Sequence, residues 1–171
     1  SATREFVTPE KILDEIKKSG VDAVLLSPWV SLVRYEAKAE ESLNACQVQN
    51  EALASLVKKY PKKIAALGMV PLQDVTLAIK ELERLMKSGL KGVEIGAHVN
   101  GIYPGDERFR PFWEACESLG AFVFIHPVEG GGLAMNDTLF SLGAARTVEG
   151  VPSNTLRFLS RGVVAPLLGL D

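Results

Sequence analysis

The chain has 171 residues, which is enough for one domain with a buried core and too few for two of typical size. Its 47% hydrophobic and 23% charged residues exclude a disordered chain, and a net charge of -2 without a basic run excludes an obvious nucleic-acid or anionic-membrane surface. No uncharged stretch approaches the roughly 20 residues of a spanning helix and the start shows no signal-peptide pattern, so we expect one soluble, cytoplasmic domain over residues 1–171.

Helices and strands are predicted to alternate along the whole chain. Segments of helical periodicity lie at residues 10–18, 45–60, 107–119 and 154–160, and a further one lies between Asp74 and Gly89, which suit its two ends. Four short segments rich in apolar or β-branched residues are predicted strands, at residues 21–27, 64–72, 92–99 and 121–127. Cys46 and Cys116 form no C-x-x-C pair and are expected to be small apolar groups on helices.

This alternation predicts an α/β fold with parallel strands, because each right-handed crossover lays a helix over the sheet. Two architectures remain open on these grounds. One is an open parallel α/β sheet, and the other is part of an eight-stranded (βα)8 barrel, whose usual length is about 250 residues. Length alone favours the open sheet.

The two histidines of the chain each end a predicted strand. In both architectures the functional edge is formed by the carboxyl ends of the strands, so we expect His98 and His126 to lie on one rim within reach of a common ligand. The alternative for each is a hydrogen-bonded packing residue. Glu94 has the same strand phase as His98, and Trp29 follows the first strand, where it could line a pocket or pack at the surface.

Two other candidates carry less weight. The glycine loop at residues 129–132 could bring backbone amides to an anion, but it lacks the G-K-[ST] ending of a phosphate loop and is better read as a flexible connection. No G-x-S-x-G elbow occurs, which excludes a serine nucleophile of that type.

Several segments together resemble the amidohydrolase-related family typified by aminocarboxymuconate semialdehyde decarboxylase. They are residues 68–74 (GMVPLQD), 89–101 (GLKGVEIGAHVNG), 112–115 (FWEA) and 125–127 (IHP), with further similarity at 50–61 and 151–155. The resemblance implies a (βα)8 barrel in which a divalent metal, commonly zinc, supports decarboxylation or hydrolysis of small carboxylated or aromatic substrates. It makes His126 a metal ligand after barrel strand five and His98 a rim residue. From their positions in the predicted strands and loops, His98, Glu94 and Trp29 are candidate substrate contacts.

The sequence departs from that family in its ligand set. It contains no H-x-H, and the resemblance ends near Gly162, so about strands two to five of a barrel are represented; Asp171 only faintly matches a family motif. A catalytic zinc usually needs three protein ligands. We therefore expect an incomplete barrel that is inactive alone and forms homo-oligomers through open sheet edges. The alternative is a non-catalytic, self-associating half-barrel that serves as a binding or structural module; a third, weaker possibility joins two copies around a pair of His126 side chains.

Overall fold

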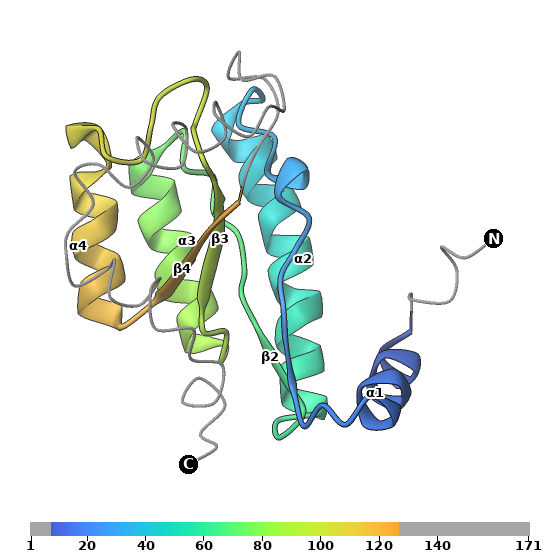
Figure 1. The fold of residues 1–171 in the computed structure, drawn as a ribbon. Coiled ribbons are helices and arrows are strands. Elements are labelled where there is room, and N and C mark those ends of the chain that lie inside the picture. Colours follow the sequence, from blue (N-terminus) through green and yellow to red (C-terminus); the bar gives the residue numbers. More distant parts are fainter. Residues whose placement is uncertain (1–7, 127–171) are drawn as a thin grey trace, which may run out of the picture.

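The computed structural model describes residues 8–126 (Figure 1). The predicted helix at 154–160, the glycine loop at 129–132 and Asp171 lie outside the described residues. Within the described range, helices and strands alternate as predicted. In chain order they are α1 Pro9–Lys18, β1 Val24–Leu26, η2 Val30–Val33, α2 Ala39–Lys59, β2 Ile64–Ala66, α3 Val75–Lys87, β3 Gly92–Gly96, η3 Glu107–Phe109, α4 Arg110–Leu119 and β4 Phe122–His126.

The strands pair in parallel, which confirms the predicted α/β class. β1 pairs with β2 and β3 with β4. The two pairs are joined just beyond β2, where Gly68 bridges to Val93 and its N–H donates to the carbonyl of Gly92 at 2.8 Å. The strands therefore lie side by side in chain order (Figure 1).

Several boundaries differ from the sequence prediction. β2 ends at Ala66 and not at 72. Residues 67–72 look like a strand in sequence because they are buried in the core, but there the chain turns, and the N–H of Leu72 donates to the Val70 carbonyl at 2.9 Å. β3 ends at Gly96, two residues before His98. α2 begins at Ala39 and not at 45. Its first turn contains acidic residues, which suit a helix start but do not contribute to the apolar periodicity used for the prediction.

The predicted helix ends are confirmed where a specific cap exists. Asp74 accepts a hydrogen bond from the N–H of Leu77 at 2.9 Å and so caps α3. Gly120 ends α4 with a φ of 62°, the left-handed conformation typical of that position.

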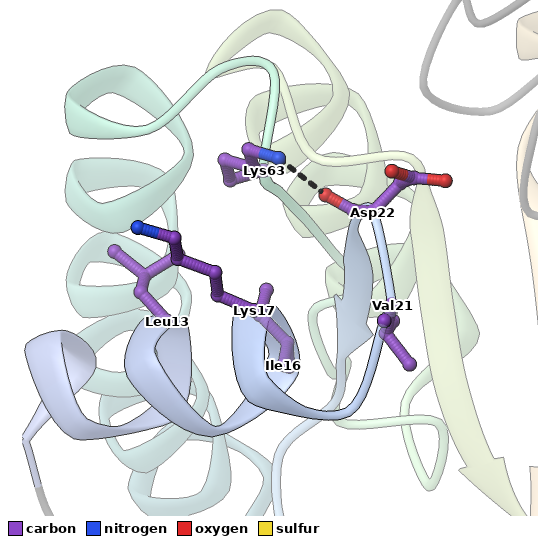
Figure 2. A pocket seen from close by; sticks show the side chains of 7 residues that line it. Leu13, Ile16, Lys17, Val21, Asp22 and Lys63 are labelled. Carbon is purple, nitrogen blue, oxygen red and sulfur yellow. Dashed lines mark hydrogen bonds between the residues drawn. The ribbon is translucent and has the colours of Figure 1, made fainter.

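Helix α1 lies at the amino-terminal end of the strands and buries none of its residues. It is tied to the end of α2 by Glu10, whose carboxylate accepts from Tyr60 Oη at 2.9 Å and Lys59 Nζ at 3.1 Å. A hollow of about 340 Å³ lies between α1 and the starts of β1 and β2, where Lys63 Nζ donates to the Asp22 carbonyl (Figure 2). This hollow is at the end of the sheet opposite to the predicted functional edge.

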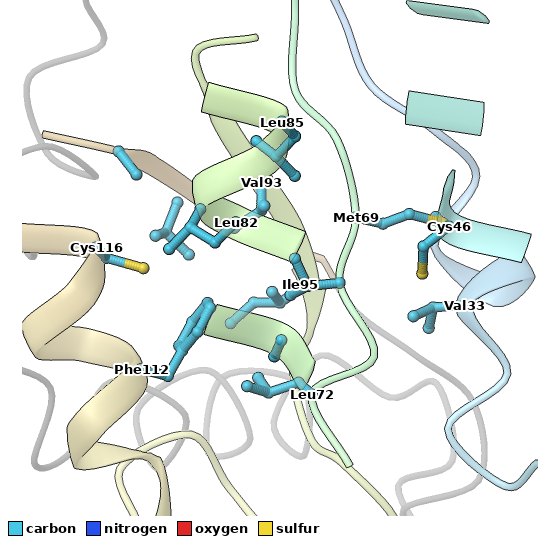
Figure 3. Close-up of a cluster of buried hydrophobic side chains, with 14 of the residues drawn as sticks. Val33, Cys46, Met69, Leu72, Leu82, Leu85, Val93, Ile95, Phe112 and Cys116 are labelled. Carbon is cyan, nitrogen blue, oxygen red and sulfur yellow. The ribbon is translucent and has the colours of Figure 1, made fainter. Parts of the chain in front are cut away.

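The core lies between one face of the sheet and the helices α2, α3 and α4 (Figure 3). From the sheet it receives Val93, Ile95 and Val123, all of them fully buried. The helices contribute apolar side chains that include Leu82, Leu85, Phe112, Trp113 and Cys116. This burial of apolar surface is the main source of stability for the fold.

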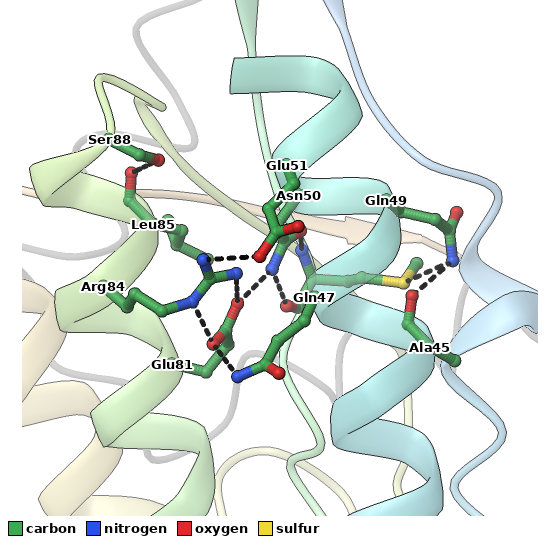
Figure 4. Close-up of polar contacts among 10 residues, drawn as sticks. Ala45, Gln47, Gln49, Asn50, Glu51, Glu81, Arg84, Leu85 and Ser88 are labelled. Atoms are coloured by element: carbon green, nitrogen blue, oxygen red, sulfur yellow. Dashed lines mark hydrogen bonds and ion pairs between the residues drawn. The ribbon is translucent and has the colours of Figure 1, made fainter. Parts of the chain in front are cut away.

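A polar network joins α2 and α3 at the edge of this core (Figure 4). Asn50 bonds both the N–H and the carbonyl of Met69 at 2.9 Å, and its Nδ2 donates to Glu81 at 2.6 Å. Arg84 forms a two-pronged ion pair with the same carboxylate, at 2.7 and 2.8 Å. Gly68 is required beside it, because a Cβ there would lie 2.6 Å from Asn50 Oδ1.

Cys46 on α2 and Cys116 on α4 are buried free thiols, as expected. Burial raises the pKa of each thiol to about 12, so both stay protonated and unreactive near neutral pH. Over residues 8–126, no helix has the length and apolar character needed to cross a bilayer.

Candidate functional site

His126 is the last residue of β4, as the sequence predicts. It is in register with Gly96, the last residue of β3, and its carbonyl accepts the N–H of Ala97 at 2.8 Å. The carboxyl ends of these two strands therefore meet at one edge, with His126 on it.

Alternation along the strands divides the β3–β4 pair into two faces. One face carries Val93, Ile95 and Val123 into the core. The other carries Glu94, Phe124 and His126, because residues in register on adjacent parallel strands point the same way, and we call it the Glu94 face. The rings of Phe124 and His126 meet edge to face, with centroids 6.1 Å apart, and Phe124 is 41% exposed.

Glu94 is the buried acid of this face, with 3% of its surface exposed. Its carboxylate accepts a short hydrogen bond from the hydroxyl of Ser27, which directly follows β1. The sequence had marked Glu94 by its strand phase but had not linked it to Ser27.

Tyr35 ties the segment after η2 to the end of β3. Its buried hydroxyl accepts the N–H of Gly96 at 3.3 Å, and its carbonyl accepts from Asn100 Nδ2 at 2.8 Å. Burial raises the pKa of this hydroxyl well above its usual value, so Tyr35 stays neutral and holds the two segments together by hydrogen bonds. Sequence reasoning missed Tyr35, because no motif marks a contact so distant in the chain.

His98 lies in the bend after β3 and is half-buried. Its Nδ1 accepts the N–H of Gly101 at 3.2 Å, and this turn holds Asn100 at a φ of 51°. Its Nε2 is buried and has no hydrogen-bond partner in the described part of the chain. The hydrogen bond at Nδ1 fits the second prediction for His98, a hydrogen-bonded packing residue. Because Nδ1 accepts this bond, the proton of the neutral ring is on Nε2, which is therefore a donor.

Burial also lowers the pKa of the His98 imidazole, which makes stability depend on pH. As pH falls through the ordinary value of about 6.5, the unfolded chain binds a proton that the folded chain binds only at lower pH. Stability is therefore expected to fall with acidification. Urea midpoints at about pH 8 and about pH 5.5 should drop more in the parent chain than in His98→Gln. Equal drops in the two proteins would rule out this contribution.

Trp29 lies in the segment between β1 and η2, and its side chain is 74% exposed. The indole N–H donates to Ser31 Oγ at 3.1 Å. The hydrogen bonds of Glu94 and His98 within residues 8–126 are to Ser27 and Gly101, and not to Trp29.

The described residues do not form a complete metal site. Imidazole nitrogen is a good ligand for divalent metals, so His126 is chemically suited to the role. Between residues 8 and 126, however, no group of three His, Cys, Asp or Glu side chains is arranged to hold an ion.

The profile of the amidohydrolase family matches residues 2–155, which is most of the chain. The chain belongs to this family. The resemblance seen in the sequence is thereby confirmed, including its closeness to the semialdehyde decarboxylases. The 2-amino-3-carboxymuconate-6-semialdehyde decarboxylase of Dictyostelium discoideum is 38% identical over 122 residues, which are 71% of this chain and 34% of that protein.

Solved structures of decarboxylases share the fold. The 5-carboxyvanillate decarboxylase of Sphingomonas paucimobilis matches with a TM-score of 0.68 at 29% identity, over 95% of this chain and 48% of that one. The 5-carboxyvanillate decarboxylase of Novosphingobium aromaticivorans, solved with bound manganese and a nitrobenzoic acid, matches with a TM-score of 0.68 at 25% identity, over 89% and 43%. The chain thus spans between a third and a half of the length of these relatives.

Proposed function

We propose that residues 1–171 form one domain that is the central part of a metal-dependent (βα)8 decarboxylase, about strands two to five of its barrel. The substrate class would be small carboxylated aromatic or conjugated compounds, by analogy with the decarboxylases named above. In this proposal β1 to β4 supply consecutive barrel strands, and their helices form the outer layer.

His126 carries this proposal. It stands at the carboxyl end of β4, beside the end of β3 and on the sheet face opposite the helices, which is where ligands of barrel enzymes gather. We propose it as one ligand of a divalent metal. The manganese in a related structure supports a divalent ion without singling out the zinc named by the resemblance. Glu94, His98 and Trp29 remain proposed substrate contacts.

Metal titration tests the role of His126. Calorimetry of the 171-residue chain with Mn²⁺ and with Zn²⁺ is expected to show weak binding that His126→Ala weakens by about tenfold or more, because one of few ligands is lost. His98→Ala is the matched control and should bind as the parent does. Equal binding by the parent and His126→Ala would contradict the proposal.

The same chain is expected to show no decarboxylase turnover, because residues 8–126 supply fewer than the three ligands that a catalytic metal usually needs. Turnover by the purified 171-residue monomer would show that this ligand argument is wrong.

A self-associating, non-catalytic half-barrel is the second candidate. The observation in its favour is that, within residues 8–126, β1 and β4 each pair with a strand on one side only. Exposed strand edges promote pairing between copies. Light scattering distinguishes the candidates, since a strict monomer in solution would remove the motive for this one.

A further inference from the structure

Two glutamates among residues 8–126 are buried, and their surroundings differ. Glu81 on α3 is 2% exposed and accepts hydrogen bonds from Gln47, Asn50 and Arg84, the last as an ion pair (Figure 4). Glu94 on β3 is 3% exposed, and within residues 8–126 its one hydrogen-bond donor is the Ser27 hydroxyl.

This difference points away from a structural role for Glu94. A buried carboxylate is costly unless charge and hydrogen bonds compensate it, and an ionised carboxylate offers about four acceptor positions. The Glu81 network supplies that compensation. Glu94 has one donor and, in the described part of the chain, no ion pair, so most of its acceptor capacity is uncommitted.

Glu94 lies next to two other residues that suit ligand binding. Its register partner on β4 is Phe124, a large apolar side chain that is 41% exposed. The next residue along the same face of β4 is His126. The Glu94 face thus combines a hydrogen-bond acceptor and an aromatic wall one strand apart, beside the proposed metal ligand.

We propose that Glu94, oriented by Ser27, accepts a hydrogen bond from a hydroxyl or amino group of a planar conjugated ligand whose ring packs against Phe124. The proton of Ser27 is directed to Glu94, so Ser27 Oγ keeps lone pairs for the same donor group. The inference rests on the proposed function and deepens it. It assigns Glu94 and Ser27 to the donor substituent of the ligand and Phe124 to the ring that carries this substituent.

Two small probes isolate the donor contact. Phenol carries a hydroxyl donor, whereas fluorobenzene has nearly the same outline and no donor. Titrations of the metal-free 171-residue chain followed by NMR should show binding of phenol about tenfold tighter than binding of fluorobenzene, a typical effect of one hydrogen bond. Glu94→Leu should remove the preference, and Phe124→Ala should weaken both probes while leaving it intact.

Denaturant midpoints separate this role from a structural one. Because Glu94 has one hydrogen-bond donor among residues 8–126, its replacement by leucine is expected to leave the midpoint of Glu94→Leu equal to that of the parent or above it. Glu81→Gln is the matched control: it should lower the midpoint, because it removes the charge opposite Arg84, and it should keep the phenol preference.

Each outcome decides the inference. A Glu94→Leu midpoint as low as that of Glu81→Gln, equal binding of both probes by the parent, or an unchanged preference in Glu94→Leu would overturn it. Because these titrations contain no metal, they are independent of the His126 test. A phenol preference that depends on Glu94, together with unaltered metal binding in His126→Ala, would refute the metal proposal and retain this one.

Discussion

Gly92→Ala is expected to destabilise the fold severely. Gly92 begins β3 with a φ of 146°, and a Cβ built there would lie 1.8 Å from the carbonyl oxygen of Phe122. That oxygen belongs to the backbone of the paired strand, so it cannot move aside without breaking the β3–β4 register. We expect a loss of at least about 4 kcal/mol in the free energy of unfolding, measured by urea denaturation followed by circular dichroism.

Gly120→Ala is the control for this prediction. Gly120 also has a positive φ, 62°, but an added Cβ there meets nothing within 4 Å. The expected cost is about 1 kcal/mol, from backbone strain alone. If both alanine variants lose the same small amount of stability, the close approach of β3 and β4 at Gly92 is not as described.

Asn50→Ala is expected to cost about 3 kcal/mol. The substitution leaves the N–H and carbonyl of Met69 without their side-chain partner in the core and removes one donor from Glu81. Buried polar groups that lose a partner each cost about 1–3 kcal/mol. Guanidinium unfolding, fitted with a common m-value, measures the difference.

Val48→Ala, on the same helix, provides a matched control. Val48 is 70% exposed, and its truncation should change stability by less than about 0.5 kcal/mol. Asn50→Asp should not rescue the loss, because it places a second negative charge beside Glu81. An Asn50→Ala protein as stable as Val48→Ala would show that the network contributes little.

Within residues 8–126, local patterns were sufficient to predict the order of helices and strands and the position of His126 at the carboxyl end of β4. Asp74 and Gly120 mark helix ends by their own chemistry, and His126 closes a strand whose apolar run is continuous. The first turn of α2 was missed because it is polar, and β2 was predicted too long because buried loop residues look like strand residues.

The contacts within the candidate site could not be predicted in the same way. Ser27 and Glu94 are 67 residues apart in sequence, and Tyr35 reaches a backbone group 61 residues away. Neither pair has a local signature, since each depends on the lateral order of strands and on loops that cross from one unit to the next. A single sequence carries the strand phase of Glu94 but not the identity of its donor.

The pairing of strands in chain order has a consequence for biosynthesis. Each of β2, β3 and β4 adds beside the unit that precedes it, and the helix between them packs against the helix before it. Each strand thus pairs with a strand that is its neighbour in chain order, which limits the entropic cost of closing the segment between them. We expect the nascent polypeptide to gain structure unit by unit as it leaves the ribosome, without waiting for distant segments to be translated.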